Sequence, residues 1–451
     1  MHRTSRLAAL SAALVITAAG ASRAADAVLD WNGVTMQVIR NAGGGPPDVS
    51  RVYGMVNAAM YDAVNAIDGG RKNLVVNAFG QAGAANGGGD ASMSAAAVNA
   101  AYTVLNSLYS GQSAYLTAQR DASLASLGAS ASVTKGLNIG SYVGNGVLAA
   151  RQNDGSANSN SPFPGGTQPG QWRPTGPGFA PAVGASAGLV TPWVIQNAAQ
   201  FRPPPPPSLT SAEYTASFNQ VKTLGALNGS TRTQDQTNIA IFWANDRNGT
   251  YKPMGQYLDI ARAIATQRGN TLVQNAALFG MAGVAIADAA TSTWEAKYHY
   301  NFWRPVTAIT DTADDGNPLT ITDPTWRPLA DSLGAPNTPP FPAYASGHAT
   351  FGAAVFRMIA NFYGTNAINF ACTTDENGQV RTFASLSDAA LENGLSRVYL
   401  GVHWDFDAYA GINSGNALAD YIFANAFQVP APGAGLAGLL GVAAIGARRR
   451  R

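Results

Sequence analysis

Apolar residues recur every three to four positions over most of the chain, as one buried face of a helix requires. The clearest case runs from 49 to 68, where Val52, Met55 and Val56 keep this spacing and Gly69 follows. The same pattern predicts further helices near 92–108, 112–127, 132–151, 210–225, 233–245, 255–267, 271–298, 347–363, 384–399 and 403–427. No long alternating run favours a strand. The predicted fold class is therefore all-α, a helical bundle.

Two stretches of low complexity interrupt this pattern. Residues 80–90 are rich in Gly and Ala, and residues 154–184 are rich in Gly, Pro, Ser and Asn. A loop as long as the second usually forms a rim, a lid or an oligomer contact. The sequence is therefore compatible with a homo-oligomer. The proline run 203–207 is stiff and extended. It separates an N-terminal helical region, 25–202, from a C-terminal helical region, 203–428, and we expect the two to form one compact unit.

The first 24 residues have the layout of a secretory signal peptide. Arg3 and Arg6 precede an apolar run over 7–20, and Ser22-Arg23-Ala24 supplies small residues for cleavage. We therefore expect export from the cytoplasm and exclude 1–24 from the fold.

The C-terminus carries a second candidate targeting signal. Val429-Pro430-Ala431-Pro432 is followed by an apolar run of about 15 residues and then by four arginines, 448–451. This layout of 429–451 resembles the PEP-CTERM sorting signal of bacterial exported proteins, with Ala431 in place of the usual glutamate. The resemblance implies transient membrane contact through the tail. It also implies a periplasmic, cell-surface or extracellular location in a Gram-negative bacterium. An ordinary tail anchor is the alternative.

Composition excludes several classes of protein. The net charge is +2 and only 12% of residues are charged, so no basic excess exists to attract a nucleic acid. The single cysteine, Cys372, rules out an intramolecular disulfide, a cysteine-based zinc site and an iron–sulfur cluster.

Histidines are scarce and stand beside other polar residues. His2 lies in the signal segment, and His299 lies between Lys297 and Arg304. Lys297 and Arg304 are two helical turns apart, which predicts a shared helix face, and Pro305 predicts that the helix ends at Arg304. Two cations at a helix end can clamp one anion. The alternative is a solvated basic face.

A second group begins a predicted helix. Ser346, Gly347 and His348 open the apolar pattern that continues to about 363. A helix N-terminus offers free N–H groups to an anion, glycine allows close approach, and histidine suits proton transfer near pH 7. The alternative is a plain Ser346 cap followed by a surface histidine.

A third group lies between two predicted helices. Arg397 and His403 are six apart, so one continuous helix would turn them by about 240° from each other. Gly401 permits the break that would bring them together. Asp407, four residues after His403, is placed to hold its imidazole in one tautomer. The alternative is a helix-start histidine with a capping aspartate.

Together the groups read Lys-x6-Arg-Pro, Ser-Gly-His and Ser-Arg-x5-His-x3-Asp. This pattern resembles the signature of the family that unites type 2 phosphatidic acid phosphatases, bacterial acid phosphatases and vanadium-dependent haloperoxidases. The resemblance implies the helical bundle of that family. One departure is Ala345, which stands where the family usually has proline before Ser-Gly-His.

Over about 190–427 the chain is most similar to the haloperoxidase branch. The similar segments surround Trp294, Phe341 and the stretch Phe242-Trp243-Ala244-Asn245-Asp246. In that branch the aspartate of the last stretch pairs with the third-motif arginine, which makes Asp246 a candidate partner of Arg397. Trp294 and Phe341 are candidates for a halide pocket. Bromide-preferring members tend to carry histidine where Phe341 stands.

The resemblance also implies a cofactor and a reaction. Vanadate would be held by one bond to His403 and by contacts to Lys297, Arg304, Ser346, Gly347 and Arg397. His348 would manage protons and Lys297 would polarise hydrogen peroxide, so that halide is oxidised to hypohalous acid. The organic acceptor is not identified by the sequence. Phosphate fits the same site.

Two other functions stay open. A soluble secreted acid phosphatase would use His403 as nucleophile and His348 to protonate the leaving group. A non-catalytic surface or matrix protein would be expected to lose motif residues, and all seven are present. An integral lipid phosphatase is disfavoured, because no internal segment reaches about 18 uninterrupted apolar residues.

Overall fold

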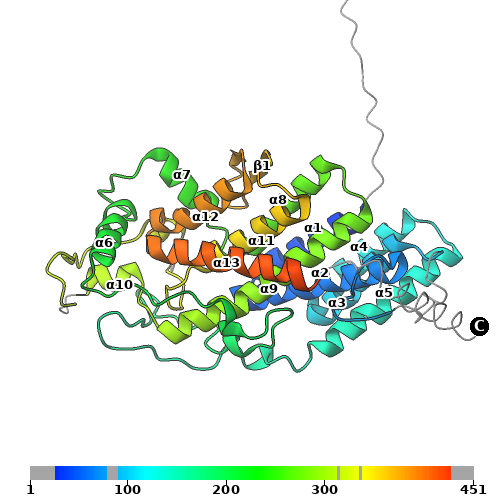
Figure 1. Cartoon of the computed structure of the whole chain (residues 1–451), viewed down its shortest axis with the longest axis horizontal. Coiled ribbons are helices and arrows are strands. Elements are labelled where there is room, and N and C mark those ends of the chain that lie inside the picture. The colour runs from blue at the N-terminus through cyan, green and yellow to red at the C-terminus, as the bar shows by residue number, and fades with distance from the viewer. Residues whose placement is uncertain (1–25, 79–89, 312–314, 335–337, 428–451) are drawn as a thin grey trace, which may run out of the picture.

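The computed structural model describes residues 26–78, 90–311, 315–334 and 338–427 (Figure 1). The predicted signal peptide 1–24 and the predicted sorting tail 429–451 lie outside these residues. The described part is mostly helical, which confirms the predicted all-α class.

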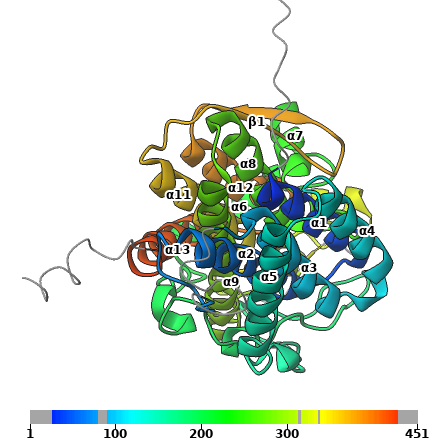
Figure 2. The ribbon, with the colours of Figure 1, turned by 90° about the vertical axis from the view of Figure 1, so that its right-hand side faces the viewer.

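The N-terminal region forms a group of neighbouring helices (Figure 2). They are α1 (Ala27–Ala42), α2 (Pro46–Asp68), α3 (Met93–Leu108), α4 (Ser113–Ala125) and α5 (Ala131–Ala150). The sequence analysis missed α1. Asp26 caps this helix by accepting the N–H groups of Val28 and Leu29.

The C-terminal region contains the remaining helices and a short hairpin. The helices are α6 (Ala212–Leu224), α7 (Gln234–Phe242), α8 (Lys252–Arg268), α9 (Leu272–Tyr300), α10 (Pro305–Thr310), α11 (Gly347–Tyr363), α12 (Leu386–Tyr399) and α13 (Asp405–Asn425). Strands β1 (Phe370–Thr373) and β2 (Val380–Phe383) pair antiparallel, with Phe370 opposite Phe383. These four-residue strands are too short to leave a clear alternation in the sequence.

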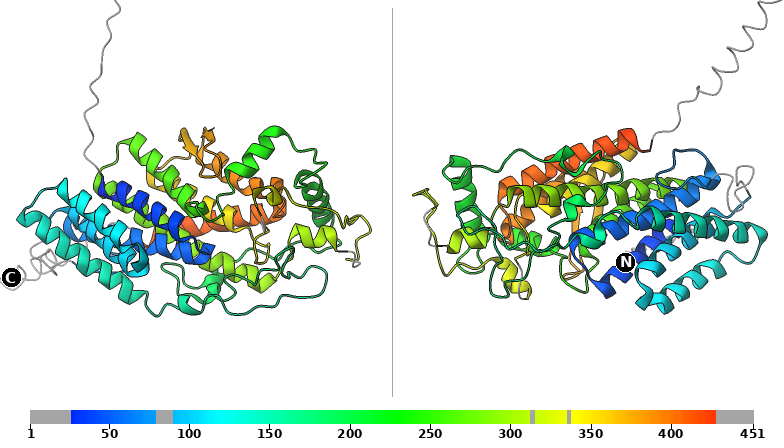
Figure 3. Two further views of the ribbon diagram at one scale, coloured as in Figure 1. Left: turned by 180° about the vertical axis from the view of Figure 1, so that it is seen from behind. Right: turned by 90° about the horizontal axis from the view of Figure 1, so that it is seen from below.

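Helix α9 runs through the middle of the molecule (Figure 3). Thr271 caps it in a capping box with Gln274. Gly280 and Gly283 allow α2 to approach closely, since a Cβ at either would lie 2.7 Å from atoms of Tyr61 or Asn57. By length and composition alone α9 could cross a membrane, but 83% of its most apolar stretch is buried inside the protein. Its position is that of a central core helix, and its last turns reach the functional residues.

The long segment between α5 and α6 has three short 3-10 turns, Ser156–Asn158, Ala187–Leu189 and Ala198–Phe201. Asp288 of α9 is fully buried and accepts the backbone N–H groups of Trp193, Val194 and Ile195 at 2.6, 2.8 and 3.0 Å. Asp154 fixes the start of the segment through an ion pair with Arg51 at 2.7 Å. The segment is therefore held against the helices at both ends.

Replacing Asp288 tests this anchor. Asp288→Ala leaves the buried N–H group of Ile195 and the partly buried ones of Trp193 and Val194 without an acceptor. We therefore expect a loss of about 3 kcal/mol in the free energy of unfolding. Urea denaturation followed by circular dichroism measures it. Asp121→Ala is the control, because that side chain is 61% exposed and pairs only with its neighbour Arg120. Equal effects of the two substitutions would contradict the assigned role.

Candidate oxyanion-binding site

Three chain segments meet in one buried site. The end of α9 and the start of α10 supply Lys297 and Arg304, and the N-terminus of α11 supplies the Ser-Gly-His group. The loop from α12 to α13 supplies the rest. The predicted residues in the site are almost fully buried, none more than 7% exposed: Trp294, Lys297, Arg304, Phe341, Ser346, Gly347, His348, Arg397, His403 and Asp407.

Arg304 reaches the site by a route that the sequence spacing did not predict. Helix α9 ends at Tyr300, and Asn301 turns the chain in the left-handed conformation with φ 49°. Arg304 is then the extended N-cap residue of α10, and Pro305 is the first residue of that helix. The prediction that Lys297 and Arg304 share one helix face is wrong. The prediction that Pro305 keeps Arg304 out of a helix is confirmed.

The imidazole of His403 is fixed in one tautomer. Arg304 Nη1 lies 3.0 Å from His403 Nε2, and Asp407 Oδ2 lies 2.8 Å from His403 Nδ1. A guanidinium only donates hydrogen bonds, so Nε2 must be the acceptor and Nδ1 must carry the proton. Burial lowers the pKa of His403 well below its usual value, and the charge of Arg304 lowers it further. His403 therefore presents a neutral ring with its Nε2 lone pair beside the cations.

Gly401 brings Arg397 and His403 to the same cavity. Its φ of 81° lies in the left-handed region, and a Cβ there would come within 2.5 Å of the Gly225 carbonyl oxygen. The turn lets the N–H groups of Val402 and His403 donate to the Arg397 carbonyl at 3.1 and 3.3 Å. The predicted break between the two helices is confirmed.

The start of α11 lies against the third segment. Ser346 is its N-cap, and its backbone N–H donates to the Asp407 carbonyl oxygen at 3.0 Å. His348 is 7% exposed and is not a surface histidine. Its Nε2 lies 3.2 Å from the Ala244 carbonyl, which only accepts, so Nε2 carries the proton and Nδ1 keeps a lone pair. Burial, with the charge of Arg397, lowers the pKa of His348 well below its usual value.

Lys297 is held by backbone oxygens. Its Nζ donates to the carbonyl oxygens of Pro342, Ala343 and Ala345 at 2.9, 2.9 and 2.6 Å. Burial and the neighbouring charge of Arg304 lower the pKa of Lys297 well below its usual value. An ammonium has three N–H donors, so a contact between Lys297 and an anion requires one of these carbonyl bonds to be exchanged.

Several guanidinium donors have no partner. Arg304 Nη2 and Arg397 Nε and Nη1 are buried and form no hydrogen bond with any residue that the structure describes. Buried donors are nearly always satisfied in folded proteins, so these three nitrogens mark a place for an acceptor. The cavity that Arg397, His348 and His403 line measures about 10 Å³, room for about one water molecule.

The predicted halide pocket and Asp246 border the same cavity. The rings of Trp294 and Phe341 are 4.9 Å apart, and Lys297 Nζ lies 5.1 Å from the Phe341 ring centroid. The predicted pairing of Asp246 with Arg397 is not present as a hydrogen bond or ion pair among the described residues. The charge of Asp246 still opposes the lowering of the Arg397 pKa that burial causes.

Sequence reasoning missed the loop that positions His348. Asn245 has φ 32°, and its Oδ1 accepts the Thr374 hydroxyl and the Asp375 N–H, both at 3.1 Å. These bonds tie the Ala244 carbonyl to the β1–β2 hairpin. Asparagine tolerates positive φ, but nothing in the local sequence indicates its distant partners. Sequence reasoning also missed a contact of the 154–184 loop. The Val183 carbonyl oxygen accepts a hydrogen bond from Trp294 Nε1 at 3.0 Å, which places this loop at the site.

Comparison with known proteins shows which proteins the chain resembles. Residues 277–430 match the family model of the VCPO second helical-bundle domain. Vanadium chloroperoxidase of Curvularia inaequalis is 32% identical over 281 residues, 49% of this chain and 46% of the relative. The match therefore spans about half the length of that curated relative.

Solved structures show the same fold. The first bacterial vanadium-dependent iodoperoxidase superposes with a TM-score of 0.72 at 23% identity, over 90% of this chain and 97% of that one. A holo-type bacterial vanadium-dependent chloroperoxidase superposes with a TM-score of 0.64 at 16% identity, over 87% and 95%. The chain thus has a vanadium haloperoxidase-like helical fold.

The histidine tautomers lead to a direct prediction. In protein free of phosphate and vanadate, His403 is expected to be neutral at pH 6.5 with its proton on Nδ1, and His348 neutral with its proton on Nε2. The physical reason is that burial beside cations lowers both pKa values below 6.5. Long-range ¹H–¹⁵N NMR of ¹⁵N-histidine-labelled protein measures this, with His348→Gln and His403→Gln to assign the signals. An imidazolium at either position at pH 6.5 would contradict the geometry.

Proposed function

We propose that the protein is a vanadate-dependent haloperoxidase that oxidises halide with hydrogen peroxide to hypohalous acid. One observation carries this proposal: His403 Nε2 accepts from Arg304 Nη1, His403 and Arg397 line the same cavity, and both guanidinium groups have buried nitrogens without a partner among the described residues. The names of the similar proteins, a chloroperoxidase and an iodoperoxidase, agree with it.

The residues fit vanadate by their donor chemistry. One neutral imidazole can form the single bond to vanadium, and the buried cations can neutralise the oxygens. Among the described residues, no group of three or more His, Cys, Asp or Glu side chains could hold a bare metal ion. An oxyanion of the metal therefore suits this site better than a simple cation. When bound, vanadate would act as a Lewis acid that activates peroxide without changing oxidation state.

The chain's own groups have separate tasks. Asp407 keeps His403 in the tautomer that can bind the anion. His348 Nδ1 is the free base that can take a proton from hydrogen peroxide, because its Nε2–H is bound to the Ala244 carbonyl. Lys297 and Arg304 supply positive charge, and the Trp294 and Phe341 rings make the neighbouring wall apolar. An apolar wall weakens halide hydration and favours halide oxidation.

An acid phosphatase is the second candidate, because the same lone pair of His403 suits nucleophilic attack on phosphorus. For either activity we propose export, with the tail 429–451 in transient contact with a membrane.

Cofactor titration distinguishes the two candidates. Purified protein is stripped of anions, titrated with vanadate and assayed with peroxide and chloride, bromide or iodide. We expect hypohalous acid only when vanadate, peroxide and a halide are all present, and inhibition by phosphate, which competes for the same donors. Hydrolysis of a phosphate ester by the stripped protein, without halide oxidation by the vanadate-loaded protein, would support the phosphatase instead.

Removing the proposed vanadium ligand gives a second test. His403→Ala is expected to abolish stoichiometric vanadate binding, measured by equilibrium dialysis, because the remaining donors are hydrogen bonds alone. His299→Ala is the matched control, since this histidine is exposed and outside the site. Stoichiometric binding by the His403→Ala protein would disprove the assignment of His403 as the ligand.

A further inference from the structure

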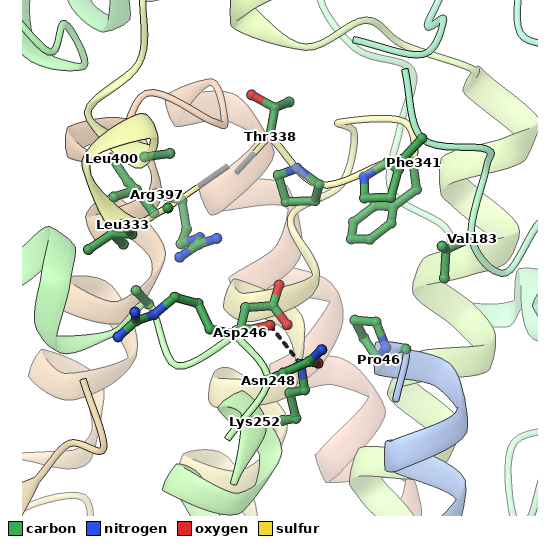
Figure 4. A pocket seen from close by; sticks show the side chains of 18 of the residues that line it. Pro46, Val183, Asp246, Asn248, Lys252, Leu333, Thr338, Phe341, Arg397 and Leu400 are labelled. Carbon is green, nitrogen blue, oxygen red and sulfur yellow. Dashed lines mark hydrogen bonds between the residues drawn. The ribbon is translucent and has the colours of Figure 1, made fainter. Parts of the chain in front are cut away.

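A larger cavity, of about 470 Å³, adjoins the inner site (Figure 4). We call it the vestibule. Pro46, Asp246, Pro339, Phe341 and Arg397 line both the vestibule and the inner cavity. A volume of several hundred cubic ångströms is typical of small-molecule sites, and it far exceeds what a halide ion or peroxide needs. A small oxidant leaving the inner site would meet this space first.

Apolar side chains form two sides of the vestibule. Leu333 and Leu400 lie on one side in Figure 4, and Phe341 and Val183 lie on the other. The rings of Pro339 and Pro340 continue the second side. Flat apolar faces of this kind bind aromatic rings through buried area and ring contacts.

Polar groups gather between these two sides. Figure 4 shows Asp246, Asn248 and Lys252 together, with the Asp246 carboxylate pointing into the cavity. Lys252 Nζ donates to the Asp246 backbone oxygen at 2.7 Å and thereby fixes this part of the loop. The Asp246 carboxylate itself has no hydrogen-bond or ion-pair partner among the described residues, although the family pattern predicted one in Arg397. It is an unpaired acceptor on the polar part of the cavity wall, between the two apolar sides.

We propose that the vestibule binds the organic acceptor, a neutral hydroxylated aromatic molecule. Its ring lies between Phe341 and Leu333, and its hydroxyl donates to Asp246. A hydroxyl also accepts a hydrogen bond, which suits the amide of Asn248 and the ammonium of Lys252. Of the cations that line the vestibule, Arg247 is paired with Glu376 and Lys252 donates to the Asp246 backbone oxygen. Arg397 is needed by the inner oxyanion, so the unpaired Asp246 carboxylate favours a neutral hydroxyl donor over an anion.

The proposed binding of the aromatic molecule does not depend on the proposed function. Its halogenation does, because it requires the hypohalous acid that a haloperoxidase would make. A ring carbon of the phenol attacks the halogen of hypohalous acid, a carbon–halogen bond forms, and the halogen–oxygen bond breaks with its electron pair on oxygen. The ring carbon is oxidised and the halogen is reduced. The ring proton joins the released hydroxide, so the products are a halophenol and water. The hydrogen bond to Asp246 raises the electron density of the ring and favours this attack.

Binding is tested without peroxide or halide, on full-length protein with phosphate in the inner site. The probes are 2-naphthol and 2-methoxynaphthalene, which differ in the hydroxyl donor, and titration calorimetry at pH 6.5 measures both. We expect 2-naphthol to bind about tenfold more tightly, as a hydrogen bond to a charged group predicts. Asp246→Asn should remove most of this preference. Equal affinity of the two probes for the wild-type protein would overturn the role of Asp246.

A blocking variant tests the place of binding. Leu333→Trp narrows the vestibule, and Leu333 does not line the inner cavity. It should weaken 2-naphthol binding at least about tenfold and leave vanadate-dependent formation of triiodide from iodide unchanged. Leu189→Trp is the matched control, since Leu189 is 81% exposed. Equal 2-naphthol affinity of the two variants would place the ligand elsewhere and overturn the proposal.

The products give a readout that binding alone does not. With vanadate, peroxide and bromide, phenol brominated in the vestibule should show an ortho-to-para ratio different from that made by added hypobromous acid. Leu333→Trp should return the ratio to the free-solution value. Identical ratios for enzyme and free oxidant would overturn halogenation in the vestibule. Absence of all halogenation, with probe binding intact, would instead reject the proposed function and retain the binding site.

Discussion

An excess of buried positive over negative charge among the described residues is the constraint around which this structure is organised. Lys297, Arg304 and Arg397 are each at most 2% exposed, and the buried carboxylate among them is that of Asp407. Like charges repel strongly where water is excluded, and desolvation lowers the pKa of each of the three. A bound oxyanion relieves both the repulsion and the missing hydrogen bonds of the guanidinium groups. The pocket is therefore less favourable empty than occupied.

The surrounding fold holds these charges in place with backbone oxygens. Carbonyl groups of 341–345 and of Val402 accept from Lys297 and Arg304. Because carbonyl oxygens carry only partial charge, they fix the cations without cancelling them. The long segment before α6 and the β1–β2 hairpin then secure the walls, through Val183 and Asn245 respectively. Elements remote in sequence thus hold the functional side chains in position, and the three short motifs supply those side chains.

This division explains what the sequence could predict. Helical periodicity predicted most helices, and Gly401, Pro305 and the His403–Asp407 spacing predicted local geometry that the structure confirms. The path from Lys297 to Arg304 could not be predicted, because a left-handed Asn301 ends α9 earlier than the spacing suggests. Contacts between backbone groups, such as Ala244 with His348, leave no side-chain signature. The anchoring role of Asp288 depends on partners about 95 residues away.

The protonation pattern of His348 bears on the choice between the two chemistries. A phosphatase needs this residue to give a proton to a leaving group, whereas a haloperoxidase needs it first to accept one from peroxide. Because Nε2–H is bound to the Ala244 carbonyl, Nδ1 is the nitrogen of the neutral ring that carries no proton. The surrounding cations stabilise that neutral form. In the anion-free site the arrangement therefore favours a neutral His348. A bound oxyanion raises the pKa of His348 for either chemistry.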